Sequence, residues 1–116
     1  MVEQLHAVLT PHDLIELQRD VQAVHASEPL ISYLQDLMAA TRSGRWFLQG
    51  LSPRAGIAIM RAAKAQAFLN QRAYVAPDDI AAVLPQTAAH RLVPVSNAGR
   101  GAAEQVRAML AATPLP

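Results

Sequence analysis

Several features that are common in other classes of protein are missing from this sequence of 116 residues. It contains no cysteine, which excludes disulfide bonds and thiolate metal sites. Aromatic residues make up 4% of the chain, whereas a β-sandwich depends on aromatic and β-branched side chains. No apolar run approaches the roughly 20 residues that cross a membrane as a helix. The formal net charge is +1, too small to draw the whole domain to nucleic acid.

The sequence also lacks the groups that most catalytic sites need. It has no glycine-rich phosphate-binding loop of the Walker type, and Lys64, its one lysine, lies within a predicted helix. No serine stands in a nucleophile turn. Four histidines show no metal-binding spacing: His6, His12, His25 and His90. We therefore predict no metal site, and we expect His25 and His90 to be capping or interface residues near helix C-termini.

What the chain does contain is typical of packed helices. Apolar residues form 52% of the sequence, and many of them are alanines. Thr10 and Asp13 form a capping-box pattern around the first of several proline-led helix starts. These starts lie at Pro11, Pro29, Pro53 and Pro77. The prediction is a mainly α fold, a small helical bundle with short strand elements between helices.

The spacing of apolar residues predicts which helix faces are buried. In the helix that begins at Pro11, the buried positions would be Leu14, Leu17, Val21 and Val24. In the next helix, which runs to about Thr41, they would be Leu30, Ile31, Leu34, Leu37 and Met38. The final helix is expected from about Ala102 to Ala112, with Val106, Met109 and Leu110 buried.

Three short extended segments stand between these helices, at residues 45–50, 73–75 and 92–95. We expect the first to pair with the second, and the third is another candidate strand. Asp78 and Asp79 open a helix after Pro77, and we assign them to capping, with metal binding as the alternative. Pro85 is expected to end or bend that helix, with a short helix following to about Arg91.

The segment at residues 50–55, GLSPRA in one-letter code, combines a helix start with an unusual charge. Ser52 has the side chain of an N-cap, and Pro53 suits the first helical position because its missing N–H costs nothing there. Arg54 then stands in the first turn, where the helix dipole disfavours a cation. A phosphate would satisfy both the guanidinium and the free backbone N–H groups. The local pattern leaves two interpretations open: a phosphate-facing arginine, or an arginine solvated at the surface.

Arg54, Arg61 and Lys64 share one stripe of the helix predicted from Pro53 to about Asn70, because steps of seven and three residues return to nearly the same face. The rest of that helix is apolar on most of its circumference, which predicts a place in the middle of the bundle. The stripe is then either the solvated edge of the helix or the face that meets a missing domain and its nucleotide.

In order and spacing, several segments closely resemble the C-terminal lid of MoxR-type AAA+ ATPases. They are GLSPRAGIAIMRAAKA at residues 50–65, NQRAYVAPDDI at 70–80 and AAHRL at 88–92. Residues 17–42 and the chain end at 109–116 fit the same lid, so the resemblance covers nearly everything from about Leu9 onward. Two positions depart from the family pattern. Gln71 stands where a turn glycine is usual, and Ala76 where a capping threonine or serine is usual.

The resemblance implies a site and a domain organisation. It places Arg54 at the family's sensor 2 position, as the catalytic arginine that stabilises charge on the phosphates of ATP, and implies that Ser52, Pro53, Arg54 and Arg61 face the nucleotide. Residues 1–10 would be a linker or the start of an expressed fragment, and 11–116 the lid, with the ATPase core upstream. ATP and Mg²⁺ would serve the intact protein, and the lid alone is expected to bind neither and to hydrolyse nothing.

The resemblance also implies partners. The lid would contact its own ATPase core and the neighbouring subunits of a cytoplasmic ring, commonly a hexamer. Such rings are associated with chaperone-like maturation of other proteins, often with von Willebrand factor A domain partners. In the AAA+ subgroup that includes MoxR, the lid is displaced so that its arginine reaches the neighbouring subunit's nucleotide. The residues of this chain alone do not decide whether Arg54 serves its own or the neighbouring subunit. No nucleic-acid partner and no membrane span are expected.

Two other classes of function stay open. One is a non-enzymatic helical interaction module whose basic stripe meets an acidic protein partner. The other is a DNA-binding regulator domain, which the balanced charge disfavours. A DNA reader needs a basic recognition helix, and the most basic helix of this chain is also its most apolar one.

Overall fold

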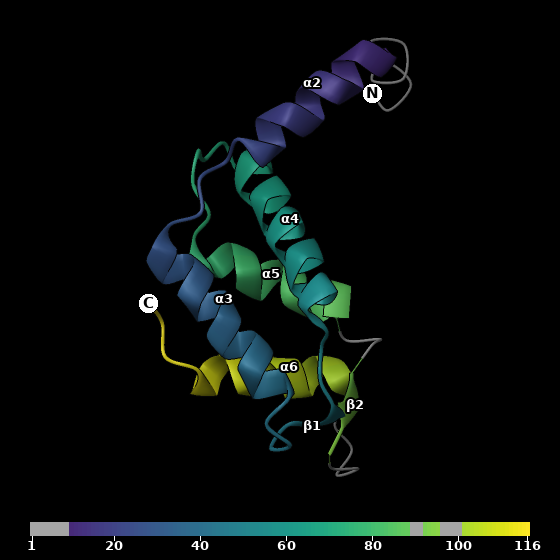
Figure 1. Ribbon diagram of the computed structural model, residues 1–116, viewed down its shortest axis with the longest axis vertical. Helices are drawn as coiled ribbons and strands as arrows, with labels where there is room; N and C mark the ends of the chain where they lie inside the picture. The colour runs from purple at the N-terminus through teal and green to yellow at the C-terminus, as the bar shows by residue number, and fades with distance from the viewer. Residues whose placement is uncertain (1–9, 89–91, 96–100) are drawn as a thin grey trace.

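The computed structural model describes residues 10–88, 92–95 and 101–116. Their elements are mostly helices, so the predicted mainly α bundle is confirmed (Figure 1). The final helix has the predicted bounds. In chain order the elements are α2 (Pro11–Gln22), α3 (Glu28–Thr41), β1 (Phe47–Gln49), α4 (Pro53–Leu69), α5 (Pro77–Ala88), β2 (Val93–Pro94) and α6 (Ala102–Ala112).

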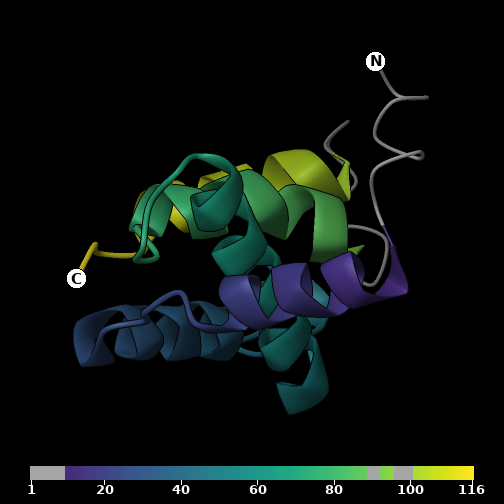
Figure 2. The ribbon, with the colours of Figure 1, turned by 90° about the horizontal axis from the view of Figure 1, so that it is seen from above.

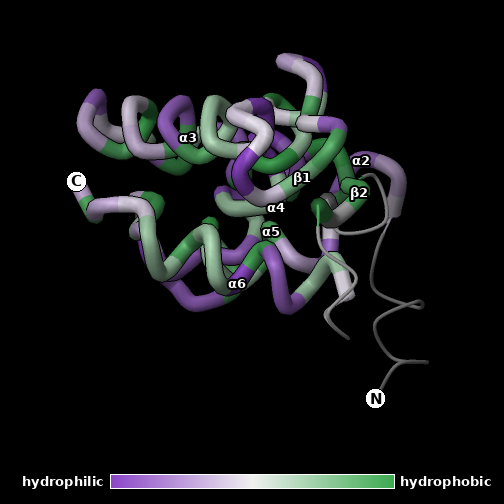
Figure 3. Tube along the Cα trace, turned by 90° about the horizontal axis from the view of Figure 1, so that it is seen from below, coloured by the Kyte–Doolittle hydropathy of each residue, from purple (hydrophilic) through white to green (hydrophobic). Residues whose placement is uncertain are grey.

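Helix α4 connects two layers of the bundle. Figure 2 shows α2 and α3 on one side and α5 and α6 on the other, with α4 crossing between them. In Figure 3 the apolar segments of α3, α5 and α6 turn toward the space between the layers. The buried face of α4 is mostly small, which lets neighbouring helices approach closely. It consists of Ala55, Ile59, Ala63 and Ala67, and larger side chains such as Phe47, Leu37, Ile80, Leu84 and Met109 fill the core around it.

The predicted helix starts are confirmed at the level of single hydrogen bonds. The Thr10 hydroxyl accepts from the Asp13 N–H at 3.1 Å, and the Asp13 carboxylate accepts from the Thr10 N–H at 3.0 Å, which completes a capping box. At the start of α3, the Ser27 hydroxyl accepts from the Leu30 N–H at 3.3 Å. These side chains satisfy backbone donors that have no partner within the helix.

The apolar face predicted for the first helix is not buried. Leu14 and Leu17 are 49% and 40% exposed, and α2 contains no buried residue. Figure 1 shows the reason, because α2 extends away from the other helices and meets α4 near its own C-terminal end. Val24, just past that end, is buried as predicted. The prediction was also wrong for Ile31 of α3, which is 41% exposed.

The predicted pairing of the extended segments is wrong. Strand β1 pairs antiparallel with β2, the third candidate, so that Phe47 lies opposite Pro94. Segment 73–75 pairs instead with His25, whose N–H donates to the Ala73 carbonyl at 2.9 Å. The reason is the length of α4: its 17 residues separate the end of β1 from segment 73–75 by about 25 Å. His25 thus follows a helix C-terminus, as predicted, and its backbone makes the contact.

Helix α5 continues through Pro85 to Ala88, so the proline does not end it. Burial of Ile80, Val83 and Leu84 along the same helix offsets the loss of one backbone hydrogen bond. His90 and the short helix predicted to end near Arg91 fall outside the described residues, as do residues 1–9. Within the described ranges, no helix is long and apolar enough to cross a membrane.

Candidate functional site

The start of α4 carries three of the predicted site residues together. The Ser52 hydroxyl accepts a hydrogen bond from the Ala55 N–H at 3.3 Å, so Ser52 is the predicted N-cap. Pro53 occupies the first helical position and has no N–H. The Arg54 N–H is therefore the first-turn donor left for an anion, beside the exposed Arg54 side chain. One backbone N–H and one guanidinium suit a single phosphate group.

A second set of contacts fixes the chain that leads into α4. The buried Thr41 hydroxyl, at the end of α3, donates to the Met38 carbonyl at 2.6 Å and accepts from the Leu51 N–H at 3.1 Å. The Arg42 guanidinium donates to the Leu51 carbonyl at 3.4 Å. A Cβ at Gly50 would lie 2.6 Å from the Thr41 carbonyl oxygen, so only glycine fits this approach. The end of α3 thus positions the start of α4.

The cations of the predicted stripe lie in different surroundings. In the part of the chain that the structure describes, ion pairs join His12 to Glu16 and Arg72 to Asp79, and Arg54 takes part in neither. Arg61 is exposed two turns further along α4, about 10 Å from Arg54 in rise. Lys64 is half-buried, and its ammonium donates to the Gln22 carbonyl at the C-terminus of α2, at 3.3 Å.

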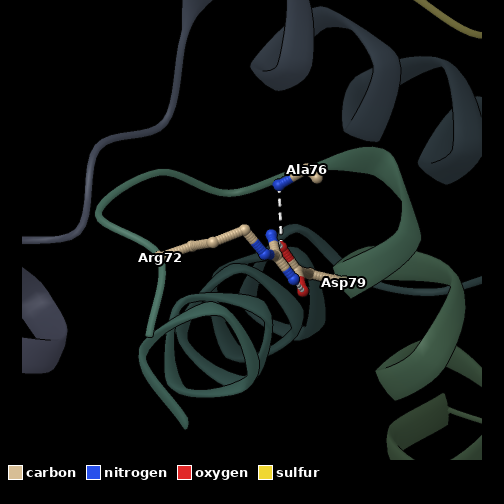
Figure 4. A network of polar contacts seen from close by, with 3 residues as sticks. All are labelled: Arg72, Ala76 and Asp79. Atoms are coloured by element: carbon tan, nitrogen blue, oxygen red, sulfur yellow. Dashed lines mark hydrogen bonds and ion pairs between the residues drawn. The ribbon is translucent and has the colours of Figure 1, made fainter. Parts of the chain in front are cut away.

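The best-satisfied charge cluster of the described chain is one that the sequence did not predict (Figure 4). The Arg72 guanidinium donates two hydrogen bonds of 2.6 Å to the carboxylate of Asp79. That carboxylate is 1% exposed and also accepts from the Ala76 N–H at 2.7 Å. Burial by itself would raise the pKa of Asp79, but the hydrogen bonds from Arg72 and Ala76 and the charge of Arg72 outweigh it and lower that pKa.

The two departures from the family pattern lie at and beside this cluster. Gln71 has φ of 60°, the left-handed conformation that glycine adopts most easily, so the position does require a turn of that kind. Ala76 has no capping side chain, and Asp79 compensates by accepting its N–H. The capping role assigned to Asp79 is therefore confirmed, and its ion pair with Arg72 is the added finding. The seven-residue separation of Arg72 and Asp79 across a turn was the available signal.

Replacing Asp79 with asparagine is expected to lower the free energy of unfolding at pH 7 by about 2 kcal/mol. The substitution removes the buried negative charge that accepts two hydrogen bonds from Arg72. The pKa of Asp79 is lower in the folded state, so its stabilisation is present above the unfolded pKa and is lost as pH falls through the folded pKa. The difference between wild type and Asp79→Asn should therefore shrink below about pH 4. Urea denaturation at several pH values measures it.

The exposed neighbour Asp78 provides the matched control for that experiment. Asp78→Asn removes the same charge from the same helix turn but breaks no ion pair, and its effect should stay well below that of Asp79→Asn. Equal effects of the two substitutions at every pH would show that the Arg72–Asp79 pair contributes nothing specific.

Comparisons with known proteins agree on the type of domain. Residues 39–111, more than half of the chain, match the family described as AAA lid domain. The uncharacterized protein YeaC of Bacillus subtilis is 41% identical over 92 residues, which are 79% of this chain and 29% of YeaC. Chaperone MoxR1 of Mycobacterium tuberculosis is 32% identical over 99 residues, 78% of this chain and 26% of MoxR1.

A solved structure matches as well. The crystal structure of a candidate ATPase from Cytophaga hutchinsonii aligns with a TM-score of 0.80 and 30% sequence identity, over 90% of this chain and 36% of that one. The helical fold and these matches thus define a AAA+ lid. The chain belongs to the AAA lid domain family, and it is the C-terminal lid of a MoxR-type AAA+ ATPase. It spans less than a third of the length of the two curated relatives.

Proposed function

We propose that this lid supplies Arg54 as the sensor 2 arginine of an ATP site, in an intact protein that hydrolyses ATP. The observation that carries the proposal is the start of α4. An arginine with no ion pair among the described residues stands in the first helical turn, beside the one first-turn N–H that Ser52 and Pro53 leave available. A cation in this position is poorly explained by the helix itself and well explained by an anion that approaches it.

The chemistry of the site fits a phosphate of ATP. A guanidinium keeps its charge at any physiological pH and offers paired donors to phosphate oxygens. Ser52 and the Thr41–Leu51 contact fix the backbone at the start of α4, and from there the exposed Arg54 side chain would stabilise charge that develops on a phosphoryl group. Arg61 follows on the same face and would lie toward the same nucleotide-binding core. ATP bound with Mg²⁺ would supply the phosphoryl group, held mainly by that core.

The proposal extends to the assembly. The relative named Chaperone MoxR1 supports a chaperone-like role for the intact protein, in which ATP hydrolysis is coupled to the maturation of partner proteins. We propose that the intact protein works as a ring in the cytoplasm, with a hexamer as the expected size. Its lid would contact the subunit's own ATPase core and a neighbouring subunit. Proteins with von Willebrand factor A domains are the partners to test first.

The test compares the intact protein with the isolated chain. With Mg²⁺, the intact protein is expected to hydrolyse ATP, whereas the 116-residue chain should show no turnover, because one arginine and a helix end cannot replace a phosphate-binding loop. Phosphate release measures turnover, and calorimetric titration measures ATP binding. An intact protein without ATPase activity contradicts the proposal, and a low-micromolar dissociation constant for the isolated lid would reveal a complete site that we have missed.

A further inference from the structure

Three adjoining hollows follow one side of α4. The first, of about 420 Å³, lies between α3 and α4, and the second, of about 460 Å³, between α2 and α4. A third, of about 450 Å³, joins them, because it shares Ile57 and Met60 with the first and Arg61 and Lys64 with the second. We call the three together the α4 groove. Figure 2 shows that its walls, α2 and α3, lie in the same helix layer, on one side of α4.

The lips of the α4 groove are apolar on all three helices. Leu17 of α2 is 40% exposed, Ile31 of α3 is 41% exposed and Ile57 of α4 is 58% exposed. Leu17 and Ile31 were expected to be buried, and Ile57 lies on a part of α4 that no other described helix covers. Large apolar side chains that gather around one concavity, in a chain with few exposed aromatics, are typical of a surface that a partner covers.

All charged residues that line the α4 groove are cations. They are Arg42 at one end and Arg61 and Lys64 at the other, and no aspartate or glutamate lines any of the three hollows. Among the described residues none of these cations has an acidic partner: Arg42 and Lys64 donate to backbone carbonyls. A partner with an apolar face and negative charges beside it would cover the apolar lips and pair with these cations.

We propose that the α4 groove binds an acidic amphipathic helix of a partner protein. Between Pro53 and Ala65, the groove follows α4 for about 18 Å, which is the length of roughly three helical turns. A helix that presents apolar residues at positions i, i+3, i+4 and i+7 fills such a groove, and glutamates beside that face reach its cations. Arg54 lines none of the hollows, so the phosphate-facing arginine lies outside the groove. Arg61, which we also place toward the nucleotide-binding core, does line it, so the partner helix and that core would share this cation.

A protein helix fits the groove better than other anionic partners. A bilayer is flat on this scale and would touch only the exposed lips of the α4 groove, leaving its floor uncovered, whereas a helix can lie within the groove. Nucleic acid would need more cations spread over a more polar face, and the net charge of the chain is only +1. An open, mostly apolar groove with a few cations at its ends instead favours a short amphipathic segment.

Two synthetic peptides of about 18 residues test the proposal, because that length is enough for a helix that spans the groove. Both carry leucines on one face, and they differ only in having glutamate or lysine beside that face. Fluorescence anisotropy with the 116-residue chain should show binding of the acidic peptide, at least tenfold tighter than the basic one. Amide shifts in nuclear magnetic resonance spectra should change along α2, α3 and α4. Rising salt should weaken the complex.

Charge reversal decides whether the cations of the groove are responsible. Lys64→Glu and Arg61→Glu should each weaken the acidic peptide about tenfold. Arg107→Glu, on the exposed side of α6 and outside the groove, should leave its affinity unchanged. Lys64→Glu also removes the contact to the Gln22 carbonyl and could disturb folding. Arg61 is exposed, so Arg61→Glu keeps the test valid in that case. Circular dichroism checks each variant.

Several results would overturn the proposal. These are equal affinities for the two peptides, shift changes confined to other helices, an Arg107→Glu effect as large as that of Lys64→Glu, or preferential binding to vesicles of phosphatidylserine and phosphatidylcholine. Self-association through the groove in analytical ultracentrifugation would replace the partner by a second copy. Binding to the isolated chain but not to the intact protein would assign the groove to its own ATPase core. ATPase activity is measured separately, so each of these outcomes leaves the role of Arg54 untouched.

Discussion

Arg54→Ala is expected to lower the rate of ATP hydrolysis by the intact protein about 100-fold or more, because a preorganised cation is removed from the reacting phosphate. The fold of the lid should not change. Arg54 is exposed, and the two hydroxyls that fix the start of α4, those of Thr41 and Ser52, accept from the Leu51 and Ala55 N–H groups and not from the Arg54 side chain. The measurement is steady-state phosphate release at saturating ATP, with circular dichroism of the variant as the check on folding.

Two companion variants give the Arg54 result its meaning. Arg54→Lys keeps the charge but loses the paired donors of guanidinium, so its rate should lie between those of wild type and Arg54→Ala. Arg107→Ala removes another exposed arginine, on α6, and should leave turnover within twofold of wild type. Unchanged turnover in Arg54→Ala would return Arg54 to the surface arginine that the local sequence also allows.

The helix starts were predictable because their signals are local. A capping side chain and the proline that follows it act within one turn, and Thr10, Ser27 and Ser52 each accept a first-turn N–H at a proline-led helix start. The same local logic found the position of Arg54. The contact that positions the start of α4 was not predicted, because Thr41, at the end of α3, and Leu51, in the segment before α4, are ten residues apart.

The errors concern what lies beside each element. Periodicity assigns an apolar face to α2, but it does not say whether anything covers that face, and Leu14 and Leu17 remain exposed. In the same way, three extended segments were recognised, and their pairing depended on the length and direction of α4. The spacing of Arg54, Arg61 and Lys64 predicted that they share one face of α4. The groove beside that face could not be predicted, because it depends on where α2 and α3 lie.

Mixing two inactive variants is expected to restore ATP hydrolysis if Arg54 serves the nucleotide of the neighbouring subunit. One variant is Arg54→Ala, and the other lacks the phosphate-loop lysine of the ATPase core. Each alone forms rings in which every site lacks one essential group. In mixed rings, some subunits with an intact phosphate loop lie next to subunits with an intact Arg54. With equal amounts and a head-to-tail ring, about a quarter of the interfaces are of this kind, which sets the expected recovery.

The alternative predicts a different result from the same mixture. If Arg54 acts on the nucleotide of its own subunit, every subunit in the mixture still carries one defect, and hydrolysis stays at background. Co-purification of differently tagged variants shows that the rings do mix, and mixing either variant with wild type shows that mixed rings can be active. Recovery should follow the product of the two subunit fractions and peak at equal amounts, because each productive interface needs one subunit of each kind. Background activity across all ratios, in rings shown to mix, would place Arg54 on its own subunit's nucleotide.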